Sequence, residues 1–136
     1  MQERAVLFVD DDEIFLQILE RNLKDEAYDK HFAGSCAEAL DILQREEVHV
    51  IVVDMVMPRM DGLELVKIVK KEYPHIVSIV LSAYAQPADV MTVMLRQGIY
   101  KYIPKPWTFD GDFIAVVREA VDNYDLLRKH ENISAE

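Results

Sequence analysis

The sequence has few of the residues that build secreted, disulfide-linked or membrane-spanning proteins. It contains one cysteine, Cys36, among 136 residues, which excludes an internal disulfide framework and is typical of a reducing cytoplasm. Its longest apolar runs are about half of the roughly 20 residues that a membrane-spanning helix needs. Residues 2–4 lead directly into an apolar run, so no signal peptide is predicted. We therefore expect a cytoplasmic protein that does not cross a membrane.

Positive charge is also scarce. The chain has 15 lysines and arginines against 25 aspartates and glutamates, a formal net charge of −10. Such a surface repels the phosphates of DNA and RNA, so we expect no direct binding to nucleic acid. With 51% hydrophobic and 29% charged residues, the composition is that of a folded globular protein, and the length suits one domain.

Apolar, strand-like runs alternate with segments of helical period five times along the chain. The five runs are Val6–Val9, His31–Ala33, Val48–Asp54, Ile76–Ser82 and Tyr102–Ile103. This alternation predicts a parallel sheet that is covered by helices on both faces. We therefore expect an α/β fold of three layers, a doubly wound (βα)5 arrangement whose five-stranded parallel sheet has the flavodoxin-like order 2-1-3-4-5.

Carboxylates stand at the ends of the first and third predicted strands. Asp10 and Asp11 follow Val6–Val9, and Asp54 closes the run that begins at Val48. In this type of sheet, ligands bind at the carboxyl ends of these two strands. Crowded carboxylates repel one another, and a divalent cation relieves that repulsion. The sequence therefore predicts an acidic metal pocket, whereas its four histidines show no metal-ligand spacing.

Four short motifs resemble those of the receiver (response regulator) domain of bacterial two-component signalling. They are Val9-Asp10-Asp11, the segment DMVMPRMDG from Asp54 to Gly62, Leu81-Ser82-Ala83 and Lys105-Pro106-Trp107. The resemblance covers residues 4–128 and implies a CheY-like receiver domain over residues 1–128. Residues 129–136 are then a C-terminal tail or the start of a connector to a missing effector. The sequence leaves open whether the receiver stands alone or belongs to a longer regulator.

The resemblance implies a phosphoacceptor that depends on magnesium. Asp54 would take a phosphoryl group from the phosphohistidine of a sensor histidine kinase or a phosphotransfer protein, and would become a phosphorylated residue. Mg²⁺ would be held by Asp10, Asp11 and Asp54 and by the backbone carbonyl of Val56. That mixture of carboxylates and a carbonyl suits the preference of Mg²⁺ for oxygen ligands.

The same resemblance implies a switch. Lys105 would pair with a phosphoryl oxygen, and the hydroxyl of Ser82 would reach toward the phosphate. Tyr102 would be the aromatic residue that moves inward, although a fixed place in the core is an equally open reading. The surface of the fourth helix, the fifth strand and the fifth helix would then control a partner or an attached output domain, and could form a homodimer.

Three other functions compete with this one. A magnesium-dependent phosphatase on a related scaffold usually has a second acid two residues after its nucleophile, where this chain has Val56. A flavin-binding protein needs a loop rich in Ser, Thr and Gly after the first strand, where this chain has four acids. A receiver that no longer accepts phosphate would not need its complete set of site residues. We therefore expect a signalling domain that turns over only its own phosphate, not an enzyme with an external substrate.

Two features depart from the receiver pattern. Trp107 stands where phenylalanine is more usual, as in some receivers attached to larger output modules such as HD-GYP phosphodiesterases. The last helix is expected to run from Asp110 to Lys129, about 20 residues or roughly 30 Å. Its end would project beyond the domain as a helical connector or a dimer seam.

Overall fold

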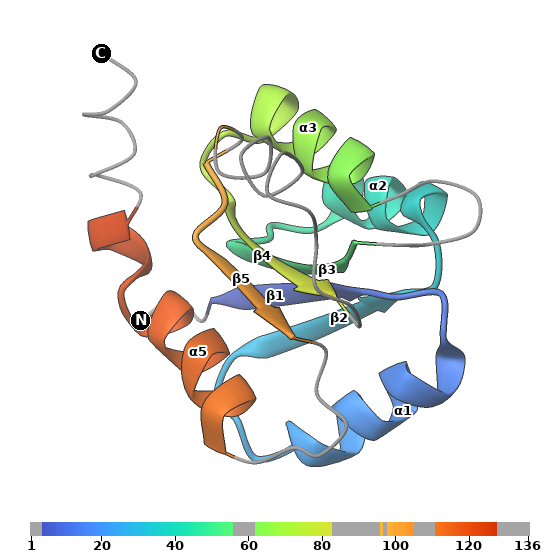
Figure 1. The fold of residues 1–136 in the computed structure, drawn as a ribbon, viewed down its shortest axis with the longest axis vertical. Helices are drawn as coiled ribbons and strands as arrows, with labels where there is room; N and C mark the ends of the chain where they lie inside the picture. Colours follow the sequence, from blue (N-terminus) through green and yellow to red (C-terminus); the bar gives the residue numbers. More distant parts are fainter. Residues whose placement is uncertain (1–3, 56–61, 83–95, 97, 105–110, 128–136) are drawn as a thin grey trace.

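A computed structural model describes residues 4–55, 62–82, 96, 98–104 and 111–127. These residues form a parallel sheet with helices on both faces (Figure 1). The strands are Ala5–Val9 (β1), Asp29–Ala33 (β2), Val50–Asp54 (β3), Val77–Ser82 (β4) and Lys101–Pro104 (β5). They lie in the order β2-β1-β3-β4-β5, and each neighbouring pair is parallel. The fold class and strand order expected from the sequence are confirmed.

Helices connect and cover these strands. The described ones are Glu13–Asn22 (α1), Cys36–Arg45 (α2), Gly62–Glu72 (α3) and Gly111–Asp122 (α5). Asp12 and Ser35 cap α1 and α2 by accepting hydrogen bonds from backbone N–H groups in the first turn. The fourth helix, which was expected to begin at Pro87, lies outside the described residues. Among the helices that the structure describes, none has the length and apolar character to span a membrane.

The sheet is buried on both sides, and alternate residues of each strand belong to different cores. Val6 and Phe8 of β1 pack in the core formed with α1 and α5, whereas Leu7 and Val9 pack in the core formed with α2 and α3. Figure 1 shows these two pairs of helices on opposite faces of the sheet. Because both faces are covered, the strands need apolar residues at nearly every position, which explains their continuous hydrophobic runs.

The C-terminal helix is not continuous. The structure ends α5 at Asp122, and a separate short helical stretch covers residues 124–127 (Figure 1). At the break, the side-chain amide of Asn123 donates a hydrogen bond to the carbonyl of Glu119 at 3.0 Å. The backbone N–H of Asn123 donates to the same carbonyl at 2.9 Å. The expectation of one unbroken helix from Asp110 is therefore wrong over the described residues, and residues 128–136 lie outside them.

Candidate metal centre

Three carboxylates meet at the carboxyl ends of β1 and β3. One oxygen from each of Asp10, Asp11 and Asp54 lies within 4.8 Å of the other two. Asp10 and Asp54 are buried, whereas Asp11 is exposed. The two strands are hydrogen-bonded neighbours, with Val9 beside Val53, so the acids that follow these residues are brought together. The convergence of these three acids, expected from the sequence, is confirmed.

Backbone hydrogen bonds hold Asp10 in place. Its N–H donates to the carbonyl of Ala33 at the end of β2, at 3.0 Å. Its carboxylate oxygen Oδ1 accepts a hydrogen bond from the N–H of Asp12 at 2.9 Å. Asp12 itself caps α1, with Oδ1 3.0 Å from the N of Ile14. The third of the consecutive acids therefore caps a helix, and its backbone N–H holds the carboxylate of the first.

The backbone around Asp54 is tightly packed against the start of α3. Asp54 ends β3 opposite Leu81 of β4, and the N–H of Gly62 donates to the carbonyl of Met55 at 2.7 Å. A Cβ at Gly62 would collide with the carbonyl oxygen of Asp54 and would lie 2.8 Å from Val53 Cγ1. The sequence identified Gly62 only as the last residue of the motif that begins at Asp54. Its contact with the backbone of Asp54 was missed, because no local pattern in the sequence indicates it.

Ser82 and Tyr102 also lie toward this edge of the sheet. Ser82 is the last residue of β4 and is buried. Tyr102 of β5 pairs in register with Val80 and packs, partly buried, against the core on the α2 and α3 side. The movement proposed for Tyr102 stays a prediction. Lys105 and Val56, the other two residues expected at the site, lie outside the described residues.

The donor atoms of the cluster fit a hard divalent cation. All three are carboxylate oxygens, the ligands that Mg²⁺ prefers, whereas zinc sites usually use imidazole and thiolate. Two of the three carboxylates are buried, where neighbouring negative charges are costly unless a positive charge offsets them. Within the described residues, no other group of at least three His, Cys, Asp or Glu side chains comes as close together. The residues present therefore suit magnesium.

Comparison with known proteins places this fold and cluster in a family. Residues 6–118 match the profile of the response regulator receiver domain. The chain belongs to this family. Over 125 residues, the receiver domain is 39% identical to the hydrogenase transcriptional regulatory protein HoxA of Cupriavidus necator. The aligned segment covers 92% of this chain but 26% of HoxA. The chain thus spans about a quarter of the length of the curated relatives it matches.

Solved receiver structures have the same architecture. The signal receiver domain of an HD domain-containing protein from Pseudomonas fluorescens Pf-5 has a TM-score of 0.83 at 29% identity, over 91% of this chain and 98% of that one. The beryllofluoride-activated NtrC4 receiver domain dimer has a TM-score of 0.78 at 28% identity, over 88% and 98%. Receiver domains are signalling domains, not conventional enzymes. The assignment confirms the resemblance seen in the four motifs and disfavours the phosphatase and flavoprotein readings.

Proposed function

We propose that this receiver domain accepts a phosphoryl group on Asp54 and signals through the conformational change that follows. The observation that carries the proposal is the meeting of the Asp10, Asp11 and Asp54 carboxylates within 4.8 Å in a member of the receiver family. The donor is the phosphohistidine of a sensor histidine kinase or a phosphotransfer protein. The site works in the cytoplasm and contacts neither nucleic acid nor a membrane directly.

The transfer needs little covalent help from the protein. An oxygen of the Asp54 carboxylate attacks phosphorus, a new P–O bond forms, and the bond from phosphorus to the donor's imidazole nitrogen breaks. The electron pair of that bond returns to the imidazole, which takes up a proton. A carboxylate is already anionic, so no general base is required. Alignment and charge neutralisation account for most of the catalysis in such transfers.

Asp10, Asp11 and Asp54 would hold Mg²⁺, with the backbone carbonyl of Val56 as a further ligand. When bound, the ion supplies positive charge that offsets the carboxylates and the phosphoryl oxygens. The hydrogen bond from the N–H of Asp12 to Asp10 Oδ1, at 2.9 Å, fixes the orientation of one ligand in advance. This pre-organisation supports the assignment of Asp10 to the metal set.

The remaining site residues read out the phosphate. Lys105 pairs with a phosphoryl oxygen, the Ser82 hydroxyl donates to another, and Tyr102 moves toward the space that Ser82 leaves. The surface of the fourth helix, β5 and α5 then changes and controls a partner or an attached output domain. The NtrC4 receiver is a dimer in its beryllofluoride-activated state, which supports homodimer formation as one output.

The direct test is chemical phosphorylation of the purified chain. With Mg²⁺ and acetyl phosphate, the intact mass should increase by one phosphoryl group, and hydroxylamine should remove it because acyl phosphates are labile to this nucleophile. A chelator should prevent the reaction. Failure of the chain to gain phosphate under these conditions, or phosphate that resists hydroxylamine, would contradict the proposed acceptor chemistry.

Magnesium should stabilise the fold, because a cation that binds only the folded pocket shifts the unfolding equilibrium. At a concentration 100 times its dissociation constant, the gain is about 2.7 kcal/mol. Thermal or urea unfolding in Mg²⁺ and in chelator measures it. Asp11→Asn should reduce the gain, whereas Asp41→Asn, which removes an acid paired with Arg45 on α2, should not. Equal stability with and without Mg²⁺ would argue against the site.

Lys105→Ala should separate phosphorylation from its consequence. We expect the variant to fold and to retain Asp54 as acceptor, but to respond less, because the phosphoryl group loses the ammonium that would pair with one of its oxygens. Chemical-shift changes in β5 and α5 on addition of beryllofluoride and Mg²⁺ measure the response. Lys67→Ala, which removes a lysine from α3, is the control. Chemical-shift changes in Lys105→Ala as large as those of the parent would show that Lys105 is not needed for the conformational response.

A further inference from the structure

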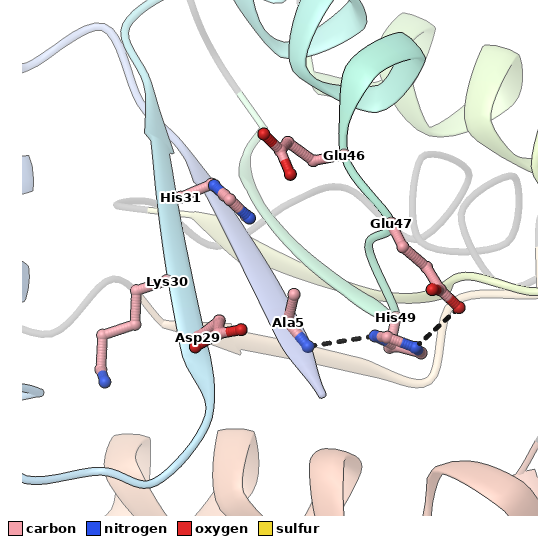
Figure 2. Close-up of a pocket in the computed structure, with 7 residues that line it drawn as sticks. All are labelled: Ala5, Asp29, Lys30, His31, Glu46, Glu47 and His49. Carbon is pink, nitrogen blue, oxygen red and sulfur yellow. Dashed lines mark hydrogen bonds and ion pairs between the residues drawn. The ribbon is translucent and has the colours of Figure 1, made fainter. Parts of the chain in front are cut away.

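A buried histidine lies at the opposite end of the sheet from the three clustered carboxylates. His49 immediately precedes β3 and is 4% exposed. The backbone N–H of His49 donates to the carbonyl of Ala5 at 2.9 Å. In return, the backbone N–H of Ala5 donates to the ring nitrogen Nδ1 of His49 at 3.0 Å, as Figure 2 shows. The two residues therefore hold each other through both backbone and side chain. Because a backbone N–H can only donate, Nδ1 must be the unprotonated nitrogen, and the single proton of the neutral ring lies on Nε2.

The imidazole also supports the helical stretch that follows α5. Its ring meets the ring of Tyr124 edge-on, with centroids 5.1 Å apart and an interplanar angle of 89°. The Tyr124 hydroxyl donates to the carbonyl of His75, before β4, at 3.0 Å. The guanidinium of Arg4 lies 4.7 Å from the centre of the Tyr124 ring and pairs with Asp125 at 2.8 Å. Residues 124–127 are thus anchored to the amino ends of β1, β3 and β4.

The pocket beside His49 does not make it a metal ligand. This pocket has a volume of about 420 Å³ and is lined by polar residues that include His31, Glu46 and Glu47 (Figure 2). A metal on Nε2 would require the ring proton to move to Nδ1. A proton on Nδ1 would face the backbone N–H of Ala5, and two donors cannot form a hydrogen bond with each other. The same geometry governs what happens when His49 gains a second proton.

Charged and titratable groups approach His49 from every neighbouring element. They are Arg4 just before β1, Asp29 and His31 of β2, Glu46 and Glu47 before β3, His75 before β4, and Tyr124 and Asp125 after α5. Glu47 Oε1 lies 3.3 Å from Nε2, but its side chain is 73% exposed, so water screens its attraction for a protonated ring. Burial lowers the pKa of His49 below its ordinary value; Glu47 opposes this shift, whereas Arg4 and His75 act in the same direction as burial.

We propose that His49 is an acid-sensitive latch: its neutral ring holds residues 124–127 against the amino ends of β1 and β3, and its protonation releases them. The second proton must go to Nδ1, where it breaks the hydrogen bond from Ala5. The imidazolium also brings its positive charge close to the Arg4 guanidinium that lies over the Tyr124 ring, and the two like charges repel. Both effects oppose the packing of Tyr124.

The direction of the pH dependence follows from linkage. The latched state binds a proton on His49 less readily than the open state does, because the pKa of the buried ring is lowered. The latch is therefore fully closed above the ordinary histidine pKa of about 6.5 and weakens as the pH falls below it. Within that window, the equilibrium constant for opening rises by up to about tenfold per pH unit.

Amide hydrogen exchange on the whole chain, followed by NMR from about pH 8 to about pH 5, tests the latch. The backbone N–H of Leu127 donates to the backbone carbonyl of Asn123 at 2.9 Å. After correction for intrinsic exchange, this N–H should lose protection as the pH falls. The N–H of Met55, at the other end of the sheet, should not. In His49→Asn, the asparagine offers Ala5 an acceptor but cannot be protonated. The protection of the Leu127 N–H in this variant should therefore be independent of pH. His31→Asn should behave like the parent.

A titration of the parent chain provides a second readout that needs no variant. The amide signal of Ala5 and the ring signals of Tyr124 should move with the same midpoint as the His49 imidazole, below the midpoint of an exposed histidine. The proposal is overturned if these signals stay constant while His49 titrates in the folded chain. It is equally overturned if His49→Asn keeps the pH dependence of Leu127 exchange. Should His49→Asn not fold, the titration alone decides.

Discussion

We expect Asp54→Asn to abolish the acyl phosphate that the parent chain forms with acetyl phosphate and Mg²⁺. The amide nitrogen and oxygen of asparagine are poor nucleophiles toward phosphorus, whereas the shape of the side chain hardly changes. The variant should therefore stay folded. In chelator it should be at least as stable as the parent, because one of the three carboxylates that lie within 4.8 Å of each other is neutralised. Intact-mass analysis and urea unfolding measure the two effects.

Asp12→Asn is the matched control for this variant. Like Asp54→Asn, it removes one negative charge, and it does so two residues from Asp10. Asparagine can still cap α1, where Asp12 accepts hydrogen bonds from the N–H groups of Ile14 and Phe15. Phosphorylation of this control should be close to that of the parent. Acyl phosphate on Asp54→Asn at the level of the parent would show that another residue is the acceptor.

The second large effect is expected from Gly62→Ala. At an exposed, unstrained helical position this change stabilises a protein by about 1 kcal/mol, because alanine is the better helix former. Here the new Cβ would collide with the carbonyl oxygen of Asp54 and would lie 2.8 Å from Val53 Cγ1. Either α3 or the end of β3 must shift, at a cost of about 1–3 kcal/mol. Because Asp54 itself is displaced, the rate of phosphorylation should also fall.

Gly34→Ala is the control for the glycine experiment. A Cβ at Gly34 would meet only Glu38 Oε2, at 4.0 Å, so its effect on stability should be small. Urea unfolding of both variants gives the comparison. A Gly62→Ala protein as stable as the parent, with an unchanged rate of phosphorylation, would mean that the close approach to Asp54 does not constrain the site.

The parts of the fold that follow from periodicity could be predicted from the sequence. Strands β1, β3 and β4 are buried on both faces, and this burial leaves continuous apolar runs that are easy to recognise. Parallel strands bring their carboxyl ends to one edge, so the meeting of Asp10, Asp11 and Asp54 followed from their positions alone. Strand β2 was predicted too short because it is an edge strand, and its first residues, Asp29 and Lys30, have no apolar signal.

Features that depend on contacts between distant segments could not be predicted. Nothing near Gly62 in the sequence shows that its α-carbon lies against the backbone of Asp54. His49 carries no motif, and its role depends on Ala5 and Tyr124, which are far away along the chain. The helical period of the sequence continues through Asn123, so the pattern does not indicate that α5 ends at Asp122.

The most direct test of the account is a crystal structure of the chain with Mg²⁺ and beryllofluoride, a stable mimic of the phosphoryl group. We predict beryllofluoride on a carboxylate oxygen of Asp54, beside a magnesium ion held by Asp11 and Asp54 with Asp10 in support. Beryllofluoride bound to any other side chain, or a magnesium ion bound away from these three carboxylates, would contradict it.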